Sequence, residues 1–219
     1  MATDELSKAA QDYLKAIYAL DTAGVRVTTS ALADRMEVSA PSATAMMKRL
    51  AELGLAERAP YRGVVLTAAG RRRALEVLRH HRLLERYLAD TLGLPLDKVH
   101  VEADRLEHAL SEELEQRIDE ALGFPTHDPH GDPIPDKYLN IIDAEARALI
   151  DLRPGDRSTV TRVPDNDAEL LRYLAELALL PGQAFELTAI APFSGPISVR
   201  TATGEHAIAR ELAAVVRAH

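Results

Sequence analysis

The chain has 219 residues, of which 47% are hydrophobic and 27% charged, and its formal net charge is −8. Its length favours two or three small domains over one. It contains no cysteine, which excludes disulfides and thiolate ligands, so a metal site must use His, carboxylate or Met side chains. No segment is apolar enough to cross a bilayer and the polar N-terminus is unlike a secretory signal, so we expect a cytoplasmic protein without a membrane partner.

The charge is unevenly distributed. Residues 1–75 carry 11 Lys and Arg against 8 Asp and Glu, whereas the remainder is strongly acidic. Because phosphate contacts need clustered basic side chains, a nucleic-acid partner fits only this first part of the chain.

In chain order, apolar residues at three- and four-residue steps predict an amphipathic helix over residues 5–20. Two shorter helices are predicted over 29–36 and 41–53, the second with Pro41 in its first turn, where proline is tolerated. Residues 55–67 hold two short apolar or alternating runs around Pro-Tyr-Arg-Gly and predict a β-hairpin. This order of elements predicts a winged helix-turn-helix.

Two longer helices are predicted over 69–92 and 97–122. The second carries Leu or Ile at every fourth residue from Leu106 to Leu122, a stripe that predicts packing against a second copy in a homodimer. Residues 123–137 hold four prolines and two glycines and are interpreted as an irregular linker. Beyond them, β-type runs at 158–163, 184–189 and 197–201 around one helix over 168–179 predict a small β-rich module.

The second helix of the helix-turn-helix opens with small polar residues, which suits contact with base edges in the major groove. The residues expected near the bases are Ser39, Pro41, Ser42 and Thr44. Phosphate contacts fix the register without reading sequence. The basic residues expected to make them are Lys48, Arg49, Arg58 and Arg62. For each of these alone, a solvated surface charge is the alternative.

Six potential metal ligands stand at helical spacing on the two longer helices. They are His81, Glu85, His100, Asp104, Glu107 and His108. His81 and Glu85 stand four apart on one face, and the other four span a sector of roughly 100°. Antiparallel helices that present histidine and carboxylate groups to each other can form a divalent-metal site. A surface network of charges is the alternative, and His127 and His130 are interpreted as turn or surface residues.

The order of these features resembles the diphtheria toxin repressor and manganese transport regulator family of metal-dependent repressors. The resemblance covers essentially the whole chain. It rests on Asp12-Tyr13-Leu14, on residues 61–67 (Tyr-Arg-Gly-Val-Val-Leu-Thr), on residues 81–86 (His-Arg-Leu-Leu-Glu-Arg), on the His100, Asp104, Glu107-His108 spacing and on residues 128–135 (Asp-Pro-His-Gly-Asp-Pro-Ile-Pro). The terminal module resembles the family's SH3-like domain.

The expected fold is therefore mainly α, with a winged helix-turn-helix DNA-binding domain (1–75), a helical metal-binding and dimerisation domain (76–142) and a small C-terminal SH3-like β domain (143–219). The resemblance also implies two metal sites per chain. The residues of the primary site would be Asp12, Asp104, Glu107 and His108. Those of the ancillary site would be His81, Glu85 and His100, to which the terminal domain can add Asp167.

Two positions depart from the family pattern: Leu170 stands where an amide is expected, and Lys15 where manganese-type members place a carboxylate. Asp12 and Asp104 replace the Met and Cys of iron-type members. Carboxylates favour oxygen-preferring ions, so we expect Mn²⁺ as the cofactor, with Fe²⁺ as the alternative.

The resemblance implies a regulator that represses metal-uptake genes and binds a palindromic operator as a metal-loaded homodimer. The hypothesis is that a cation ties the first helix to the dimer-forming helix and shifts the population toward the DNA-competent form. Two alternatives from other classes remain open. One is a carboxylate-bridged di-metal enzyme, since helix bundles often house Glu and His ligands, and the other is a winged-helix regulator of an organic ligand.

Overall fold

The computed structural model describes residues 6–59, 61, 63–143 and 145–219. The chain divides into two compact units. The first comprises the residues up to His80 together with 107–110 and 135–140, and the second comprises 81–106, 111–134 and 141–219. Among the described residues, no helix combines the length and hydropathy needed to span a membrane.

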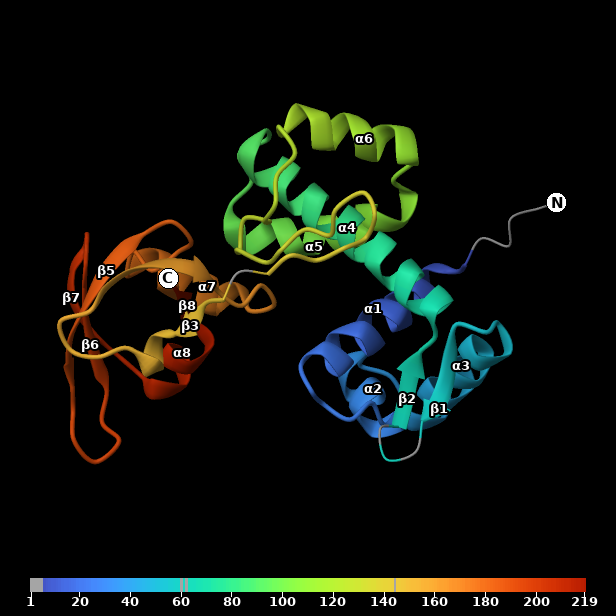
Figure 1. Cartoon of the computed structure of the whole chain (residues 1–219), viewed down its shortest axis with the longest axis horizontal. Helices are drawn as coiled ribbons and strands as arrows, with labels where there is room; N and C mark the ends of the chain where they lie inside the picture. The colour runs from blue at the N-terminus through green and yellow to red at the C-terminus, as the bar shows by residue number, and fades with distance from the viewer. Residues whose placement is uncertain (1–5, 60, 62, 144) are drawn as a thin grey trace. The chain divides into compact units, whose positions relative to one another are not determined.

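Three helices and a hairpin make up most of the first unit (Figure 1). They are α1 (Lys8–Thr22), α2 (Thr29–Arg35), α3 (Ala40–Glu52), β1 (Ala56–Ala59) and β2 (Gly63–Leu66). The hydroxyls of Ser7, Thr28 and Ser39 cap the three helices by accepting a backbone hydrogen bond in the first turn, and Ser7 explains why α1 begins later than expected. The helices bury Leu14, Ile17, Leu32 and Leu50. The predicted winged helix-turn-helix is confirmed.

The helix predicted over 97–122 is wrong. After α4 (Ala68–Asp90), the chain forms α5 (Leu96–Leu106), a 3-10 turn η1 (Glu107–Ala109) and α6 (Glu112–Ala121). Ser111 restarts the helix, because its hydroxyl accepts from the Leu114 N–H and acidic residues fill the first turn of α6. The leucine stripe is split as a result: Leu106 and Leu114 are exposed, whereas Ile118 is buried.

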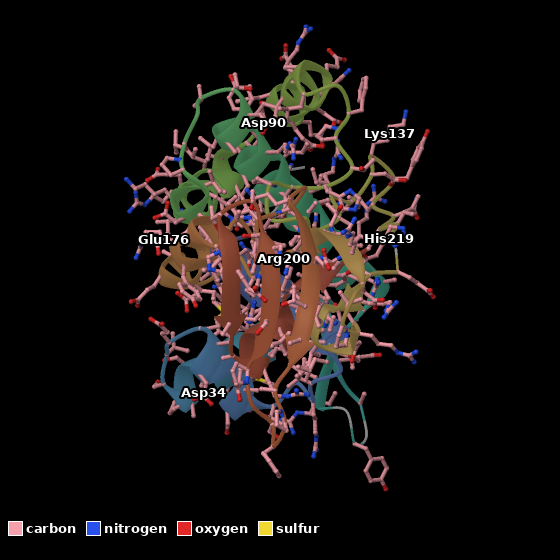
Figure 2. The ribbon with its side chains drawn as sticks, turned by 90° about the vertical axis from the view of Figure 1, so that its left-hand side faces the viewer. Asp34, Asp90, Lys137, Glu176, Arg200 and His219 are labelled. Carbon is pink, nitrogen blue, oxygen red and sulfur yellow. The ribbon has the colours of Figure 1, made fainter. Side chains whose placement is uncertain are left out.

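The second unit ends in a six-stranded antiparallel sheet with the order β3-β8-β4-β5-β6-β7. Its strands are β3 (Arg147–Ala148), β4 (Arg157–Arg162), β5 (Ala184–Ile190), β6 (Ile197–Thr201), β7 (Gly204–Ile208) and β8 (Arg217–Ala218), with η2 (Leu149–Asp151), α7 (Ala168–Glu176) and α8 (Arg210–Val215) between them. Figure 2 shows the sheet face that carries Arg200 of β6. The β-rich terminal module is confirmed. Its helix α7 contacts α5, where Arg172 donates to Asp97 at 2.8 Å.

The interpretation of residues 123–137 as a linker is wrong. The segment has no helix or long strand, as its prolines dictate, but many of its residues are buried. Arg82 donates to the Pro133 carbonyl at 2.6 Å, and the Val163 N–H donates to the His130 carbonyl at 3.0 Å. Gly131 has φ +93°, and a Cβ there would lie 1.8 Å from the Thr161 carbonyl oxygen, so only glycine allows this approach to β4.

Candidate metal centre and nucleic-acid interface

Three potential ligands meet between α1 and η1, and we call them the Asp12 cluster: Asp12, Glu107 and His108. One ligand atom from each lies within 4.8 Å of the others. His108 Nε2 lies 2.8 Å from Asp12 Oδ1 and 3.4 Å from Glu107 Oε1. His108 Nδ1 lies 2.8 Å from Gln11 Oε1 and can donate to it, which leaves the lone pair of a neutral ring on Nε2, facing both carboxylates. The arrangement suits a divalent cation.

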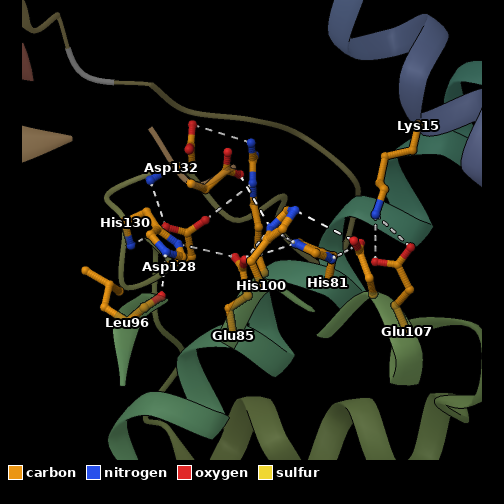
Figure 3. A network of polar contacts seen from close by, with 12 residues as sticks. Lys15, His81, Glu85, Leu96, His100, Glu107, Asp128, His130 and Asp132 are labelled. Atoms are coloured by element: carbon orange, nitrogen blue, oxygen red, sulfur yellow. Dashed lines mark hydrogen bonds and ion pairs between the residues drawn. The ribbon is translucent and has the colours of Figure 1, made fainter. Parts of the chain in front are cut away.

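The 3-10 turn that interrupts the expected helix carries Glu107 and His108 into this cluster. The Glu107 side chain has no exposed surface, and a buried carboxylate is costly unless it is paired. Lys15, one turn after Asp12 on α1, supplies the pairing: its Nζ lies 2.7 and 2.9 Å from the two Glu107 oxygens (Figure 3). Burial raises the pKa of the Asp12 carboxyl above its ordinary value, although His108 and Lys15 oppose the shift.

A second group of potential ligands surrounds Glu85 of α4 (Figure 3). We call it the Glu85 cluster, and it comprises His81, Glu85, His100, Asp128, His130 and Asp165. Glu85 Oε1 lies 3.0 Å from both His81 Nε2 and His100 Nδ1. Glu85 Oε2 lies 3.8 Å from His130 Nδ1. Burial alone would raise the pKa of the Glu85 carboxyl, but the three histidines around it outweigh burial and hold the pKa well below its ordinary value. Glu85 therefore remains ionised and can bind a cation.

Three buried atoms of this cluster have no hydrogen-bond partner among the described residues. They are Glu85 Oε2, Asp128 Oδ2 and His130 Nδ1. Glu85, Asp128 and His130 also each offer a ligand atom within 4.8 Å of the others. His130 Nε2 lies 3.3 Å from the Leu96 carbonyl oxygen and can only donate to it, so Nδ1 of a neutral ring is an acceptor. Buried acceptors that face one another are costly unless a proton or a cation lies between them.

Asp104, expected at the primary site, lies beside two histidines of the Glu85 cluster. Its carboxylate oxygens are 3.3 Å from His81 Nδ1 and 3.7 Å from His100 Nε2. One ligand atom from each of these three residues lies within 4.8 Å of the others. Asp104 belongs to the same compact unit as the two histidines.

The terminal domain places a different carboxylate beside His100 from the one expected at the ancillary site. Asp165 Oδ2 lies 3.9 Å from His100 Nδ1, and Asp165 groups with Glu85 and His100 as a set of potential ligands. Asp167 caps α7 instead, because its Oδ1 accepts two backbone N–H groups of the first turn at 3.0 Å each.

Sequence reasoning missed Asp128, His130 and Asp165. His130 lies in a turn, as interpreted, but the expectation that it lies on the surface is wrong, because its side chain is completely buried. The prolines around it led to the linker interpretation and so to an expectation of exposure. The available signal was Asp128 and His130 two residues apart in a segment that contains four prolines.

The buried Asp128 carboxyl predicts a pH-dependent stability. Burial raises the pKa of Asp128 from its ordinary 3.8 to about 8, with a further rise from the Glu85 and Asp132 carboxylates and an opposing effect of Arg82. Between those pH values the folded chain keeps a proton that the unfolded chain has released. The contribution of this group to stability therefore falls as the pH rises from about 4 to about 8.

We expect Asp128→Asn to stabilise the metal-free protein increasingly with pH. Asparagine keeps the oxygen that accepts the His130 and Asp132 N–H groups at 2.9 Å and cannot ionise. The melting temperature should rise by a few degrees near about pH 8 and by less near about pH 5, since about 1 kcal/mol corresponds to about 2–4 °C. Thermal unfolding across this range measures it, with the exposed Asp34→Asn as control. A difference that shrinks toward pH 8 would contradict the prediction.

The residues expected near DNA bases lie at the N-cap and on the first two turns of α3, and all are exposed: Ser39, Pro41, Ser42 and Thr44. The Ser39 and Ser42 hydroxyls lie 2.8 Å apart. The Thr44 hydroxyl donates to the Ala40 carbonyl at 2.9 Å. This exposed helix start has the composition and the accessibility that base contacts need.

Of the residues expected to bind phosphates, Lys48, Arg49 and Arg58 are exposed, and Arg62 lies outside the described residues. Arg58 also lines a groove of about 460 Å³ between the start of α2, α3 and the hairpin. Arg26, which the sequence analysis did not single out, lines the same groove. Two guanidinium groups thus border one groove beside α3.

The chain is similar to known proteins over three successive parts of its sequence. Three family models match the chain: the iron dependent repressor N-terminal DNA binding domain at residues 5–64, the iron dependent repressor metal binding and dimerisation domain at 67–136, and the FeoA domain at 147–218. A solved manganese-dependent transcriptional repressor in complex with manganese is 41% identical, with a TM-score of 0.86, and the match covers 96% of this chain and 99% of that one. The chain belongs to the diphtheria toxin repressor family of metal-dependent repressors.

Curated relatives agree with this family assignment. The iron-dependent repressor IdeR of Mycobacterium leprae is 41% identical over 132 residues, which are 60% of this chain and 57% of the relative. The diphtheria toxin repressor of Corynebacterium efficiens is 42% identical over 123 residues, 56% of this chain and 54% of the relative. The match thus spans little more than half the length of these two relatives. Members of the family are DNA-binding repressors rather than enzymes, which removes the di-metal enzyme as an alternative.

Proposed function

We propose that this protein is a metal-dependent transcriptional repressor in which a divalent cation bound by the Asp12 cluster controls DNA binding. The observation that carries the proposal is the meeting of Asp12 on α1 with Glu107 and His108 on η1 within 4.8 Å. A cation at this point ties the first helix of the DNA-binding part to the turn between α5 and α6. Without it, Asp12 and Glu107 repel each other, which favours a looser arrangement. The assignment of Asp104 to this site stays a prediction.

The proposed cation is Mn²⁺, with Fe²⁺ as the second choice. Two carboxylates and one imidazole form a ligand set rich in hard oxygen donors, and the chain has no thiolate to favour softer ions. The related repressor in complex with manganese supports the same choice.

We propose a second cation site at the Glu85 cluster, so that each chain binds two ions. Its candidate ligands are His81, Glu85, His100, Asp128, His130 and Asp165. The buried atoms of Glu85, Asp128 and His130 that lack a hydrogen-bond partner support this proposal, because a cation would satisfy all three together. Asp165 replaces Asp167 in the proposal, since Asp167 is engaged as a helix cap.

The DNA partner is proposed to be a palindromic operator near metal-uptake genes, bound in the cytoplasm by a homodimer. Palindromy follows from two-fold symmetry, since each protomer presents one recognition helix to one half-site. The match of residues 67–136 to a dimerisation domain and the exposure of Val101, Leu106 and Leu114 support the dimer. Arg26 joins the proposed phosphate contacts. We retain the division into domains at 1–75, 76–142 and 143–219.

The function is tested by selecting bound duplexes from a random DNA library with Mn²⁺ present and measuring their affinity for the protein with Mn²⁺ and with a chelator. We expect the recovered sequences to be palindromic and Mn²⁺ to tighten binding about 5- to 150-fold, the usual range for coupling between two sites. Equal affinity under both conditions would reject the metal switch. Calorimetric titration that detects no Mn²⁺ binding would favour a regulator of an organic ligand instead.

A further inference from the structure

Arg162, the last residue of β4, joins the terminal domain to the turn that carries His130. Its Nε donates to the Gly131 carbonyl at 3.2 Å and lies 3.5 Å from Asp132 Oδ1. Its Nη2 donates to Asp143 Oδ1 at 2.5 Å. The side chains of Arg162 and Asp132 are only 27% and 21% exposed. One guanidinium thus engages these three partners at once, which the planar fork of arginine allows and the single ammonium of lysine does not.

The course of β4 brings Arg162 to this turn. The pairing of β4 with β8 shifts register just before Arg162, and such an irregularity bends a strand and re-aims its side chains. The next residue, Val163, is buried, and its N–H donates to the His130 carbonyl at 3.0 Å. On the other side of the turn, Arg82 Nη2 lies 3.5 Å from the same Asp132 oxygen. Asp132 therefore lies between two guanidinium groups, one from α4 and one from β4.

The position of Asp165 depends on this contact. Asp165 follows Arg162 by three residues, and its Oδ2 lies 3.9 Å from His100 Nδ1. Three residues span at most about 10 Å, so Asp165 stays near His100 only while the end of β4 is held in place. Pro164, between them, fixes one further backbone angle. A guanidinium has no lone pair and cannot ligate a cation, so any effect of Arg162 on an ion must act through its neighbours.

We infer that Arg162 is a positioning residue for the second cation: by fixing the end of β4 to the His130 turn, it presents Asp165 of the terminal domain to the Glu85 cluster. This inference rests on the proposed function and adds to it the residue that makes the carboxylate of the terminal domain available. The contact needs no metal, because its partners are a carbonyl and carboxylates of the chain itself. Binding of an ion therefore does not have to order this segment, which favours affinity.

The test isolates the second site in full-length protein that carries Asp12→Ala, with Glu85→Gln as the reference for its loss. Arg162→Met removes the guanidinium and keeps an unbranched side chain, whereas Arg162→Lys keeps the charge but not the fork. Arg157→Met is the matched control, because Arg157 lies on the same strand, is 82% exposed and pairs with Glu186 instead. A surface pair of this kind contributes little.

Each variant of Arg162 and Arg157 is made with Asp165 intact and with Asp165→Asn. We expect Arg162→Met to weaken Mn²⁺ binding about 10- to 100-fold when Asp165 is intact, the usual effect of losing a partner behind a metal ligand. With Asp165→Asn, it should weaken binding by no more than about twofold, because the two residues act as one unit. Arg162→Lys should lose less than Arg162→Met, and Arg157→Met should match its parent.

A second readout needs no metal. In the metal-free protein, the Val163 amide should exchange its hydrogen faster in Arg162→Met than in the parent or in Arg157→Met, because the contact that covers it opens more often. The same loss of Mn²⁺ affinity with and without Asp165, no loss in either, or a Val163 amide that exchanges at the parental rate would overturn the inference.

Two further outcomes keep the conclusions separate. If Arg162→Met does not fold, the same comparison with Arg162→Lys decides. If Glu85→Gln binds Mn²⁺ as well as its Asp12→Ala parent, the second cation site of the proposed function fails, and the inference fails with it. A site that depends on Glu85 but not on Arg162 rejects the positioning role alone.

Discussion

Asp12→Ala is expected to abolish the effect of Mn²⁺ on DNA binding and to weaken Mn²⁺ binding at the Asp12 cluster by about a hundredfold or more. Losing a partner behind a metal ligand typically costs about 10- to 100-fold, and losing a ligand should cost at least as much. The fold should persist, because the Asp12 side chain is 36% exposed and its removal relieves repulsion with Glu107.

The measurement is calorimetric titration with Mn²⁺, followed by fluorescence anisotropy of a labelled duplex selected as above. Asp34→Ala is the control for metal affinity, because it removes an exposed carboxylate of the same unit that lies outside the cluster. If Asp12→Ala still bound DNA in a Mn²⁺-dependent manner, the coupling of α1 to η1 through the ion would be wrong.

Glu85→Gln is expected to remove the second ion and leave the first. Glutamine has nearly the same volume as glutamate, so the buried site keeps its packing, but the negative charge disappears. The oxygen that now lies 3.0 Å from both His81 Nε2 and His100 Nδ1 loses its charge or is replaced by an amide nitrogen. Bound Mn²⁺ should fall from two ions per chain to one, with the affinity of the remaining site within a few-fold of its original value.

Metal analysis after dialysis at saturating Mn²⁺ gives the stoichiometry of this variant. Glu76→Gln is the matched control, since Glu76 lies on the same helix and pairs with two exposed arginines, Arg72 and Arg73. A stoichiometry of two in Glu85→Gln would argue against the Glu85 cluster as a metal site. The variant also separates the two sites, because DNA binding that remains Mn²⁺-dependent in it must depend on the Asp12 cluster.

Elements with a strong local signal could be predicted from the sequence. The periodic apolar residues of α1, α2 and α3 predict these helices, and the short runs around residues 60–63 predict the hairpin. Periodicity alone could not show that the helix predicted over 97–122 is interrupted, because the leucine spacing continues through the break at η1. The local cap at Ser111 outweighs that periodicity.

The histidine and carboxylate spacing on α4 and α5 was enough to single out Glu85, His81 and His100 as candidate ligands, because residues three and four apart on a helix share a face wherever that helix lies. Spacing could not show that Asp128 and His130 join them. Those two residues come from a segment without periodicity, and its burial depends on contacts with Arg82 and with β4.

The sequence by itself therefore determined the winged helix-turn-helix, the β-rich terminal module and half of the candidate ligands around Glu85, because these depend on local propensity and helical spacing. Only the tertiary structure decided that Lys15 pairs with Glu107, 92 residues away, and that Asp165 rather than Asp167 reaches His100. The physical reason is that such contacts depend on where separately formed elements pack, and no periodicity along the chain records that.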